Sequence, residues 1–334
     1  MERILLLLAR RTPVLLIFIR SNIYIVWGPR TPMRLALLLL MLAIPVLMAS
    51  ADGGPKVVCS TTVLGSIVRD LAGDSVEVEV IASPSICPGH YDARPSDAYA
   101  IAEADLILYH GIEPWVEELR TASGSRAPAV RITGGWNTPD SLKSMYINVS
   151  RTLDKYLGLN TSAKLDRCLR AIDETAEDLR RIAELKGFSG KPVVSMMFQA
   201  DFLKFLGFRI VATFPPPEKV SAKLFDSIVR NASEGKAVLV VDNLQSGTEI
   251  GSRIASQVNA VEVALSNFPG SPPELGNMTQ VMRWNAERLA EALSHAELRA
   301  SVGESRSQAQ IYEALAAILA VIAIVEAILI LRRR

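Results

Sequence analysis

The stretch KVVCSTTVLGSIVRDLAGDSVEVEVI, residues 56–81, changes its hydrophobic period twice. Residues 56–60 form a short apolar run, which is typical of a buried strand. Residues 63–72 carry apolar side chains at helical spacing and stop at Gly73, and residues 76–81 alternate with a period of two. A strand, a helix and a strand in this order predict a βαβ unit with parallel strands.

The same alternation continues to about residue 293. After a loop rich in proline and glycine, Ser96 is a candidate N-cap for a helix to Ala104, and ADLILY at 104–109 predicts a buried strand. In the second half, the pattern predicts strands at 192–197, 209–214, 237–242 and 260–265, and helices at 201–207, 221–232, 246–257 and 278–295.

Residues 161–186 form one amphipathic helical pattern, about 39 Å long at ~1.5 Å per residue. That length is enough to brace two lobes. We therefore expect an α/β protein with parallel sheets in two lobes, residues 52–160 and 191–293, joined by a long backbone helix at 161–190.

The C-terminus predicts a single membrane anchor at residues 311–334. The run IYEALAAILAVIAIVEAILIL, residues 311–331, would span about 31 Å as a helix, which matches the core of a bilayer. Three arginines, Arg332 to Arg334, follow the run and favour a cytoplasmic end, so the body would be extracellular. Residues 294–310 are polar and predict a stalk. The alternative is a buried core helix.

The N-terminal 51 residues predict an export signal. Residues 3–26 contain Arg10, Arg11 and Arg20, so they would make a poor spanning helix. Residues 33–51 combine a positive start, an apolar centre and small residues at the end, which favours a secretory signal cleaved near Asp52. The alternative is an uncleaved anchor within residues 1–51.

The charge balance argues against nucleic-acid binding, and the absence of catalytic motifs argues against an enzyme. The 334 residues include 36 Lys and Arg against 35 Asp and Glu, so there is no general excess of cations to neutralise phosphates. The sequence has no P-loop, no G-x-S-x-G and no H-E-x-x-H pattern, so we expect no enzyme. Ligands bind beyond the carboxyl ends of parallel strands, and two such lobes predict a binding cleft.

The loop CPGHYDARPSD, residues 87–97, resembles the metal-specific solute-binding proteins of zinc and manganese ABC importers. Their loop reads roughly Pro-His-x-Tyr-x-Pro-x-Pro-Ser-Asp. The segments at 100–119, 191–207 and 282–285 are similar to the same family, and the resemblance covers about residues 56–293. It implies an extracellular protein that captures a transition metal ion, zinc or manganese, and delivers it to an ABC permease in the membrane.

The family binds its metal with one side chain from each of four loops. Carried over by position, the resemblance places the first ligand at His90 and the second at Gly134, two residues before Trp136. It places the third at Met196 and the fourth at Asn267. The chain has only 3 His, and Gly134 has no side chain to offer. The family's three-histidine zinc site therefore cannot be assembled from this sequence.

Other candidate ligands are of the soft type. Cys59 ends the first strand, Cys87 precedes His90 by three residues, and Met196 and Met197 end a strand of the second lobe. Cysteine, histidine and methionine suit an ion such as Cu(I). The competing interpretations are that Cys59 and the methionines fill the core, or that Cys59 and Cys87 form a disulfide.

Asp242 ends the strand AVLVVD and is a further candidate. It could contact the ligand, or it could cap the next helix together with Asn243.

Two other functions remain open at the level of sequence. The same fold could bind a solute that is not a metal, because the family's ligand positions are altered. It could also serve as a scaffold for an extracellular adhesion or sensing module, since a fold does not fix a function.

Overall fold

The computed structural model describes residues 14–19, 22–27 and 54–332, with side chains described for 54–303 and 308–319. It divides into two units, residues 1–53 and 54–334. The first unit contains an antiparallel hairpin of β1 (Val14–Ile19) and β2 (Asn22–Trp27), rich in the β-branched residues that favour strands. The signal predicted at 33–51 lies outside the described residues.

The first lobe is built on a four-stranded parallel sheet. Its strands lie in the order β4-β3-β5-β6, which is typical of an open sheet with crossover helices. They are β3 (Lys56–Cys59), β4 (Glu77–Val80), β5 (Leu106–Tyr109) and β6 (Ala129–Arg131). The first three were expected from the sequence. The three-residue β6 is too short to give a periodic signal.

The second lobe repeats this architecture with a sheet in the order β10-β9-β7-β8, again parallel throughout. Its strands are β7 (Pro192–Met196), β8 (Arg209–Phe214), β9 (Leu239–Asn243) and β10 (Val261–Leu265). The predicted class, two α/β lobes with parallel sheets, is confirmed.

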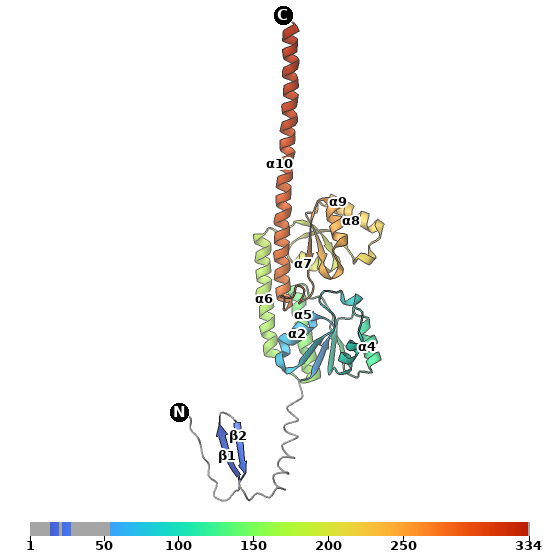
Figure 1. Ribbon diagram of the computed structural model, residues 1–334, viewed down its shortest axis with the longest axis vertical. Coiled ribbons are helices and arrows are strands. Elements are labelled where there is room, and N and C mark those ends of the chain that lie inside the picture. The colour runs from blue at the N-terminus through green and yellow to red at the C-terminus, as the bar shows by residue number, and fades with distance from the viewer. Residues whose placement is uncertain (1–13, 20–21, 28–53, 333–334) are drawn as a thin grey trace. The chain divides into compact units, whose positions relative to one another are not determined.

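Helices cover both faces of each sheet (Figure 1). The first half of the chain supplies α2 (Thr62–Ala72), α3 (Pro95–Ala102), α4 (Trp115–Ser123) and α5 (Pro139–Leu157). The second supplies α7 (Ala200–Phe205), α8 (Ala222–Glu234) and α9 (Glu249–Val258).

The predicted cap of α3 at Ser96 is wrong. The Asp97 carboxylate accepts the Arg94 N–H at 2.7 Å at the start of the helix, which begins earlier, at Pro95.

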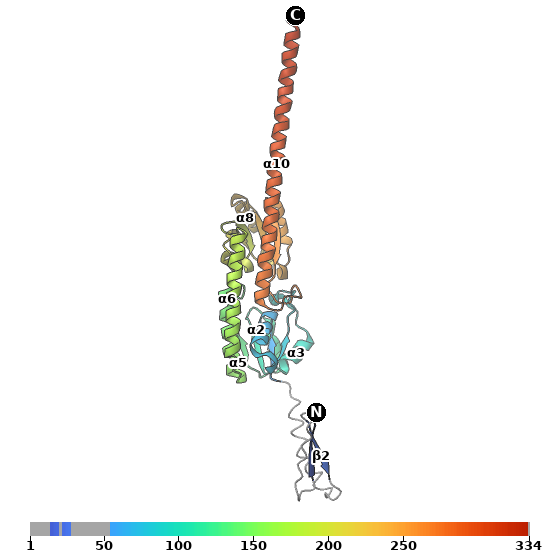
Figure 2. The same cartoon turned by 90° about the vertical axis from the view of Figure 1, so that its left-hand side faces the viewer.

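Two long helices run side by side (Figures 1 and 2). The connecting helix predicted from the sequence is α6 (Ser162–Leu185), and it passes along both lobes. Its partner is α10 (Met278–Arg332), which passes along the second lobe and extends beyond it. Residues 294–310, predicted as a stalk, continue α10 as a helix. This stretch contains no proline and many alanine, glutamate and arginine residues, all of which favour helix.

No helix in the described part of the chain is both long enough and apolar enough to cross a membrane. The anchor predicted at 311–334 extends into residues 320–334, whose side chains lie outside the description.

The core is divided by the two sheets. Because successive strand residues point to opposite faces, Val57 and Cys59 pack toward α2, α5 and α6, whereas Val58 packs toward α3 and α4. The second lobe divides in the same way, with Val241 on the side of α10 and Val240 beneath α8 and α9. Both strand faces are therefore buried, as parallel sheets require.

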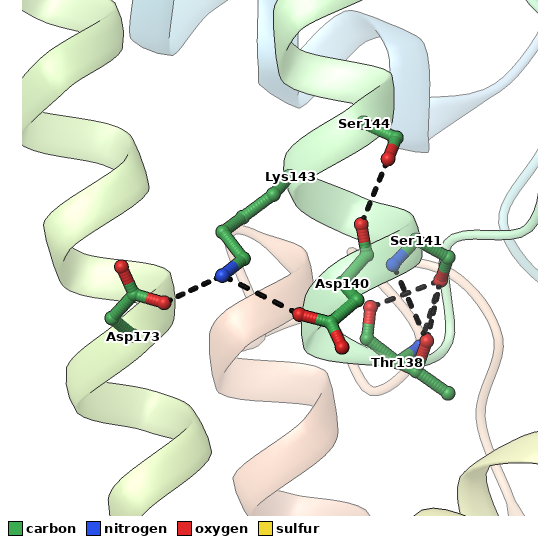
Figure 3. Close-up of polar contacts among 6 residues, drawn as sticks. All are labelled: Thr138, Asp140, Ser141, Lys143, Ser144 and Asp173. Atoms are coloured by element: carbon green, nitrogen blue, oxygen red, sulfur yellow. Dashed lines mark hydrogen bonds and ion pairs between the residues drawn. The ribbon is translucent and has the colours of Figure 1, made fainter.

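Ion pairs link the long helices at their surfaces. Lys143 on α5 donates to Asp173 on α6 at 2.7 Å and pairs with Asp140 at 3.4 Å (Figure 3). Arg283 on α10 donates to Asp178 on α6 at 2.9 Å. These contacts are partly exposed and lie at the outer surface of the helices.

Candidate functional site

A cavity of about 290 Å³ lies between the two lobes. Cys87, Ile112 and Trp136 line it from the first lobe, and Phe198 and Asn267 line it from the second. These residues follow the carboxyl ends of strands or lie in loops beside them, which is where parallel sheets place ligands. The binding cleft expected from the sequence is therefore present, and we call it the inter-lobe cavity.

Glu113 organises the loop that forms one wall. Its Oε1 accepts the Ser60 hydroxyl at 2.6 Å and the His110 N–H at 3.1 Å. Its Oε2 accepts the Gly111 and Ile112 N–H groups at 2.7 and 2.8 Å. The carboxyl is buried, and these four donors compensate its charge in place of a cation. The loop is thereby held rigidly next to the cavity.

His110 lies behind that wall and is a structural residue. Its Nε2 is 2.9 Å from the Thr61 hydroxyl, and its ring lies against the Trp136 ring with centroids 4.4 Å apart. Burial lowers the pKa of His110 to about 4, although the nearby Glu113 opposes the shift. The imidazole is therefore neutral at pH 7, and it supports Trp136 at the cavity.

Neutral hydrogen bonds join the two lobes across the cavity. The Trp136 indole N–H donates to the Asn267 carbonyl at 2.8 Å. The Asn137 amide N–H₂ donates to Asn267 Oδ1 at 3.0 Å, and Gln245 Nε2 donates to the Pro84 carbonyl at 3.0 Å. Because Trp136 and Asn137 immediately precede the N-cap of α5, the helix start fixes their position.

Asn267 occupies the centre of an amide cluster. Its Oδ1 accepts from both Asn137 Nδ2, at 3.0 Å, and Gln199 Nε2, at 2.9 Å. Its backbone N–H donates to Gln245 Oε1 at 3.1 Å, and the residue is 4% exposed. The oxygen that the sequence suggested as a ligand is therefore already engaged by two donors.

His90 faces away from the inter-lobe cavity. It ends a short 3-10 helix, Pro88–His90, and its exposed Nε2 lies 3.5 Å from Glu218 Oε1 of the second lobe. Cys87 and Pro88 line the cavity, but His90 does not. The structure thus brings Cys87 and Asn267 to one cavity and leaves His90 at its outer edge.

The remaining sulfur candidates are divided between core and cavity. Met196 is 1% exposed within the second lobe, and its Sδ accepts the Phe198 N–H at 3.3 Å. Cys59 is fully buried in β3, where burial raises its thiol pKa to about 12. Met197 lines the cavity and is half exposed. All three cysteines of the chain are described and are free thiols, so the disulfide considered above is not formed.

Asp242 lies beneath α9 and does not line the inter-lobe cavity. Its carboxyl group is fully buried against Gly251, where an added Cβ would overlap it. Burial first, and then the charge and side-chain hydrogen bond of Glu262, raise the pKa of Asp242 to about 8. It does not cap α9, which begins after Thr248.

The donor set does not fit a zinc or manganese ion. Such sites use four or more nitrogen, oxygen or thiolate ligands at ~2.0–2.2 Å. Among the described residues, no three His, Cys, Asp or Glu side chains come together in a way that could hold a metal. Asp201 lines the cavity, but its side chain is 83% exposed and pairs with Lys204 at 3.3 Å.

Sequence reasoning missed most of the amide side chains around the cavity. Asn137, Gln199, Asn243 and Gln245 all lie next to the cavity or the amide cluster. Asn243 and Gln245 follow the buried run of β9, and Gln199 follows β7. The sequence pattern that could have indicated these residues is an amide side chain directly at or after the end of a buried strand.

A family model described as "zinc-uptake complex component A, periplasmic" (ZnuA) matches residues 57–292. Among curated proteins, the high-affinity zinc uptake system protein ZnuA of Paracoccus denitrificans is 32% identical over 75 residues, which is 22% of this chain and 23% of that relative. The chain spans only 18% to 32% of the length of the first curated relatives that it matches.

Solved structures share the fold at low sequence identity. The periplasmic zinc-binding protein TroA of Treponema pallidum aligns with a TM-score of 0.63 and 17% identity, covering 72% of this chain and 99% of that one. A mutant of the laminin-binding adhesin Lmb of Streptococcus agalactiae aligns with a TM-score of 0.61 and 17% identity, covering 72% and 100%. These likenesses establish the two-lobed architecture.

Proposed function

Because the chain belongs to the family of periplasmic zinc-uptake components matched at residues 57–292, we propose that it is an extracytoplasmic solute-binding protein that serves an ABC permease. The family is one of binding proteins and not of enzymes. The observation that carries the proposal is the inter-lobe cavity, which lies where two parallel sheets present their strand ends to one another.

The geometry supports a simple cycle of capture and release. The hydrogen bonds from Trp136, Asn137 and Gln245 hold the lobes together around the cavity. Breaking these few neutral bonds would let a lobe move while α6 and α10 keep the body intact. A permease that separates the lobes would then release the cargo.

The test is photo-crosslinking in native membranes. A benzophenone side chain at Leu244 or Ile86, both exposed next to the loops of the cavity, should capture an ABC permease subunit. The same group at the exposed Leu185, at the end of α6, is the matched control and should not. Capture of no transporter subunit from either cavity position would contradict the proposal and favour an adhesion or sensing role.

A transition metal ion is a candidate for the cargo, because Cys87 and Met197 line the same cavity and suit a soft ion such as Cu(I). The full-length chain in mild detergent would be loaded with Zn²⁺, Mn²⁺ or Cu(I), desalted and assayed by elemental mass spectrometry. Near one equivalent, lost in Cys87→Ala but not in Cys168→Ala, would support metal capture. His90→Ala tests the ligand carried over from the family. If the chain retains none of the three metal ions, a metal cargo is excluded.

The membrane anchor predicted at 311–331 belongs to the same proposal, with the body outside and Arg332 to Arg334 in the cytoplasm. Its support is a row of apolar side chains on α10 that are 50% to 70% exposed: Ile311, Tyr312, Leu315, Ile318 and Leu319. The full-length chain should stay with membranes after an alkaline carbonate wash, and a chain ending at residue 310 should be released. Release of both would contradict the anchor.

A further inference from the structure

On the basis of that binding function, we propose that the inter-lobe cavity takes a small neutral organic molecule. The molecule would have a flat apolar part and an amide-like group that both donates and accepts hydrogen bonds. It would occupy the cavity in place of a metal ion.

Three of the four positions where the family resemblance placed a metal ligand are closed to that use. Gly134 has no side chain, and the Met196 sulfur is buried and engaged by a backbone N–H. Asn267 Oδ1 already accepts from two amide groups at 2.9 and 3.0 Å. Neutral hydrogen bonds between the lobes thus replace the charged ligands that an ion would need.

The walls of the cavity are apolar and aromatic. Trp136 and Phe268 line it with ring centroids 5.8 Å apart, and Phe198 lines it from the short 3-10 helix before α7. Ile112 and Met197 add exposed apolar surface. Such rings bury and orient a flat apolar group by offset or tilted stacking.

Charge is nearly absent from the lining. No Lys, Arg, His or Glu among the described residues lines the cavity, and its one carboxylate, Asp201, points to solvent beside Lys204. A ligand with a net charge would lose its hydration without gaining a partner of opposite sign. This favours a neutral ligand.

Two amide side chains that line the cavity, Asn243 and Asn137, each have one buried polar atom without a partner among the described residues. Asn243 is 1% exposed; its Oδ1 accepts the Ser246 hydroxyl at 3.2 Å, and its Nδ2 has no acceptor. Asn137 donates through Nδ2 to the Phe198 carbonyl at 2.7 Å, which leaves its Oδ1 without a donor. Buried polar groups are normally paired, so a ligand group that both donates and accepts is the kind of partner that these two amides lack.

The size agrees with this chemistry. The cavity volume of about 290 Å³ is close to the lower end of the roughly 300–1,000 Å³ that is typical of small-molecule pockets. That volume accommodates a single ring with an amide substituent, and it exceeds what one ion requires.

The experiment uses three probes of nearly one shape. The full-length chain in lipid nanodiscs is titrated at pH 7 with benzamide, benzoate or toluene, with empty nanodiscs as the blank, and followed by calorimetry and ligand-observed NMR. Benzamide should bind with a millimolar or lower dissociation constant. Benzoate, which is charged, and toluene, which cannot hydrogen-bond, should each bind at least about tenfold more weakly.

A variant then locates the site. Asn243→Asp replaces a neutral amide beside the cavity by a carboxylate and should weaken benzamide binding at least about tenfold, while Asn231→Asp on the exposed face of α8 should not. The comparison of benzamide with benzoate on the native chain needs no variant, so the proposal stays testable if Asn243→Asp does not fold.

Each other outcome has a defined meaning. Benzoate binding as tightly as benzamide, or no binding of benzamide, would overturn the neutral-ligand proposal. About one equivalent of metal retained by the same preparation and lost in Cys87→Ala would also overturn it, while leaving the solute-binding function intact. The permease crosslinks test that function separately.

Discussion

Glu113 is the residue on which the wall of the inter-lobe cavity depends. Four donors converge on its buried carboxylate, three of them from the backbone of the same loop. Removing the carboxylate would leave these donors unpaired in the interior, where an unsatisfied polar group costs free energy.

We therefore expect Glu113→Ala to lower the free energy of unfolding by about 3 kcal/mol. Glu118 is exposed in the first turn of α4, so Glu118→Ala should change the free energy of unfolding by less than about 0.5 kcal/mol. Urea unfolding followed by circular dichroism measures both. Equal effects of the two substitutions would contradict the role given to Glu113.

The raised pKa of Asp242 predicts that the free energy of unfolding decreases as pH rises. Its pKa is raised to about 8 in the folded protein, against 3.8 for an ordinary Asp, so between these values the folded state holds a proton that the unfolded state has lost. The stability that it contributes is complete below about pH 4 and decreases as pH rises toward 8. The lowered pKa of His110 has the opposite effect, so it makes the folded state more stable as pH rises. That gain is complete above about pH 6.5, the ordinary pKa of histidine.

Between pH 6.5 and 8.5, the native chain should therefore lose more stability than Asp242→Asn, which cannot ionise. Urea midpoints at several pH values measure the difference. Parallel curves for the two proteins would mean that Asp242 does not titrate in this range.

At the scale of elements, the close approach of α9 to β9 requires a glycine. A Cβ at Gly251 would overlap the Asp242 carboxylate, whereas a Cβ at Gly303, on the distal part of α10, would meet no atom within 4 Å. The same substitution should thus have opposite effects in the two helices.

We expect Gly251→Ala to destabilise the protein by about 1–3 kcal/mol through overpacking. Gly303→Ala should stabilise α10 by up to about 1 kcal/mol through helix propensity. Urea unfolding measures the first, and amide hydrogen exchange along α10 measures the second. A neutral Gly251→Ala would show that α9 can shift away from the sheet.

The ion pair between α5 and α6 should contribute little. Lys143 and Asp173 are 30% and 58% exposed, so water and salt screen their 2.7 Å contact (Figure 3). A double-mutant cycle with alanine should give a coupling of about 0.2–1 kcal/mol that decreases in 1 M salt. A larger coupling that salt does not change would mean that the pair is effectively buried.

At the scale of the whole molecule, a few amide bonds hold the lobes together. Asn137 bonds to both the Phe198 carbonyl and Asn267 Oδ1, so Asn137→Ala removes two of these contacts at once. We expect a larger radius of gyration by small-angle scattering and faster hydrogen exchange in the loops of the cavity. Asn231→Ala, on the exposed face of α8, should leave both unchanged. Identical scattering from the two variants would show that other contacts keep the cavity closed.

The two-lobed α/β fold and its family could be predicted from the sequence because both depend on local patterns. Hydrophobic periodicity in residues 56–81 and in the amphipathic run at 161–186 can be read directly from the order of apolar and polar side chains. That order is a property of each segment by itself. The loop at 87–97 carried the family resemblance in the same local way.

The candidate site could be predicted only as a list of residues. The strand period cannot say that Asp242 lies under α9, that Met196 points into a core or that His90 faces Glu218, because each depends on which face of a sheet or loop meets another element. Asn137 and Asn267 are 130 positions apart in the chain, and their hydrogen bond exists only because the two lobes meet. The sequence by itself therefore determined the elements, their order and the family, whereas the tertiary structure alone decided which side chains surround the cavity, since that requires contacts between distant segments.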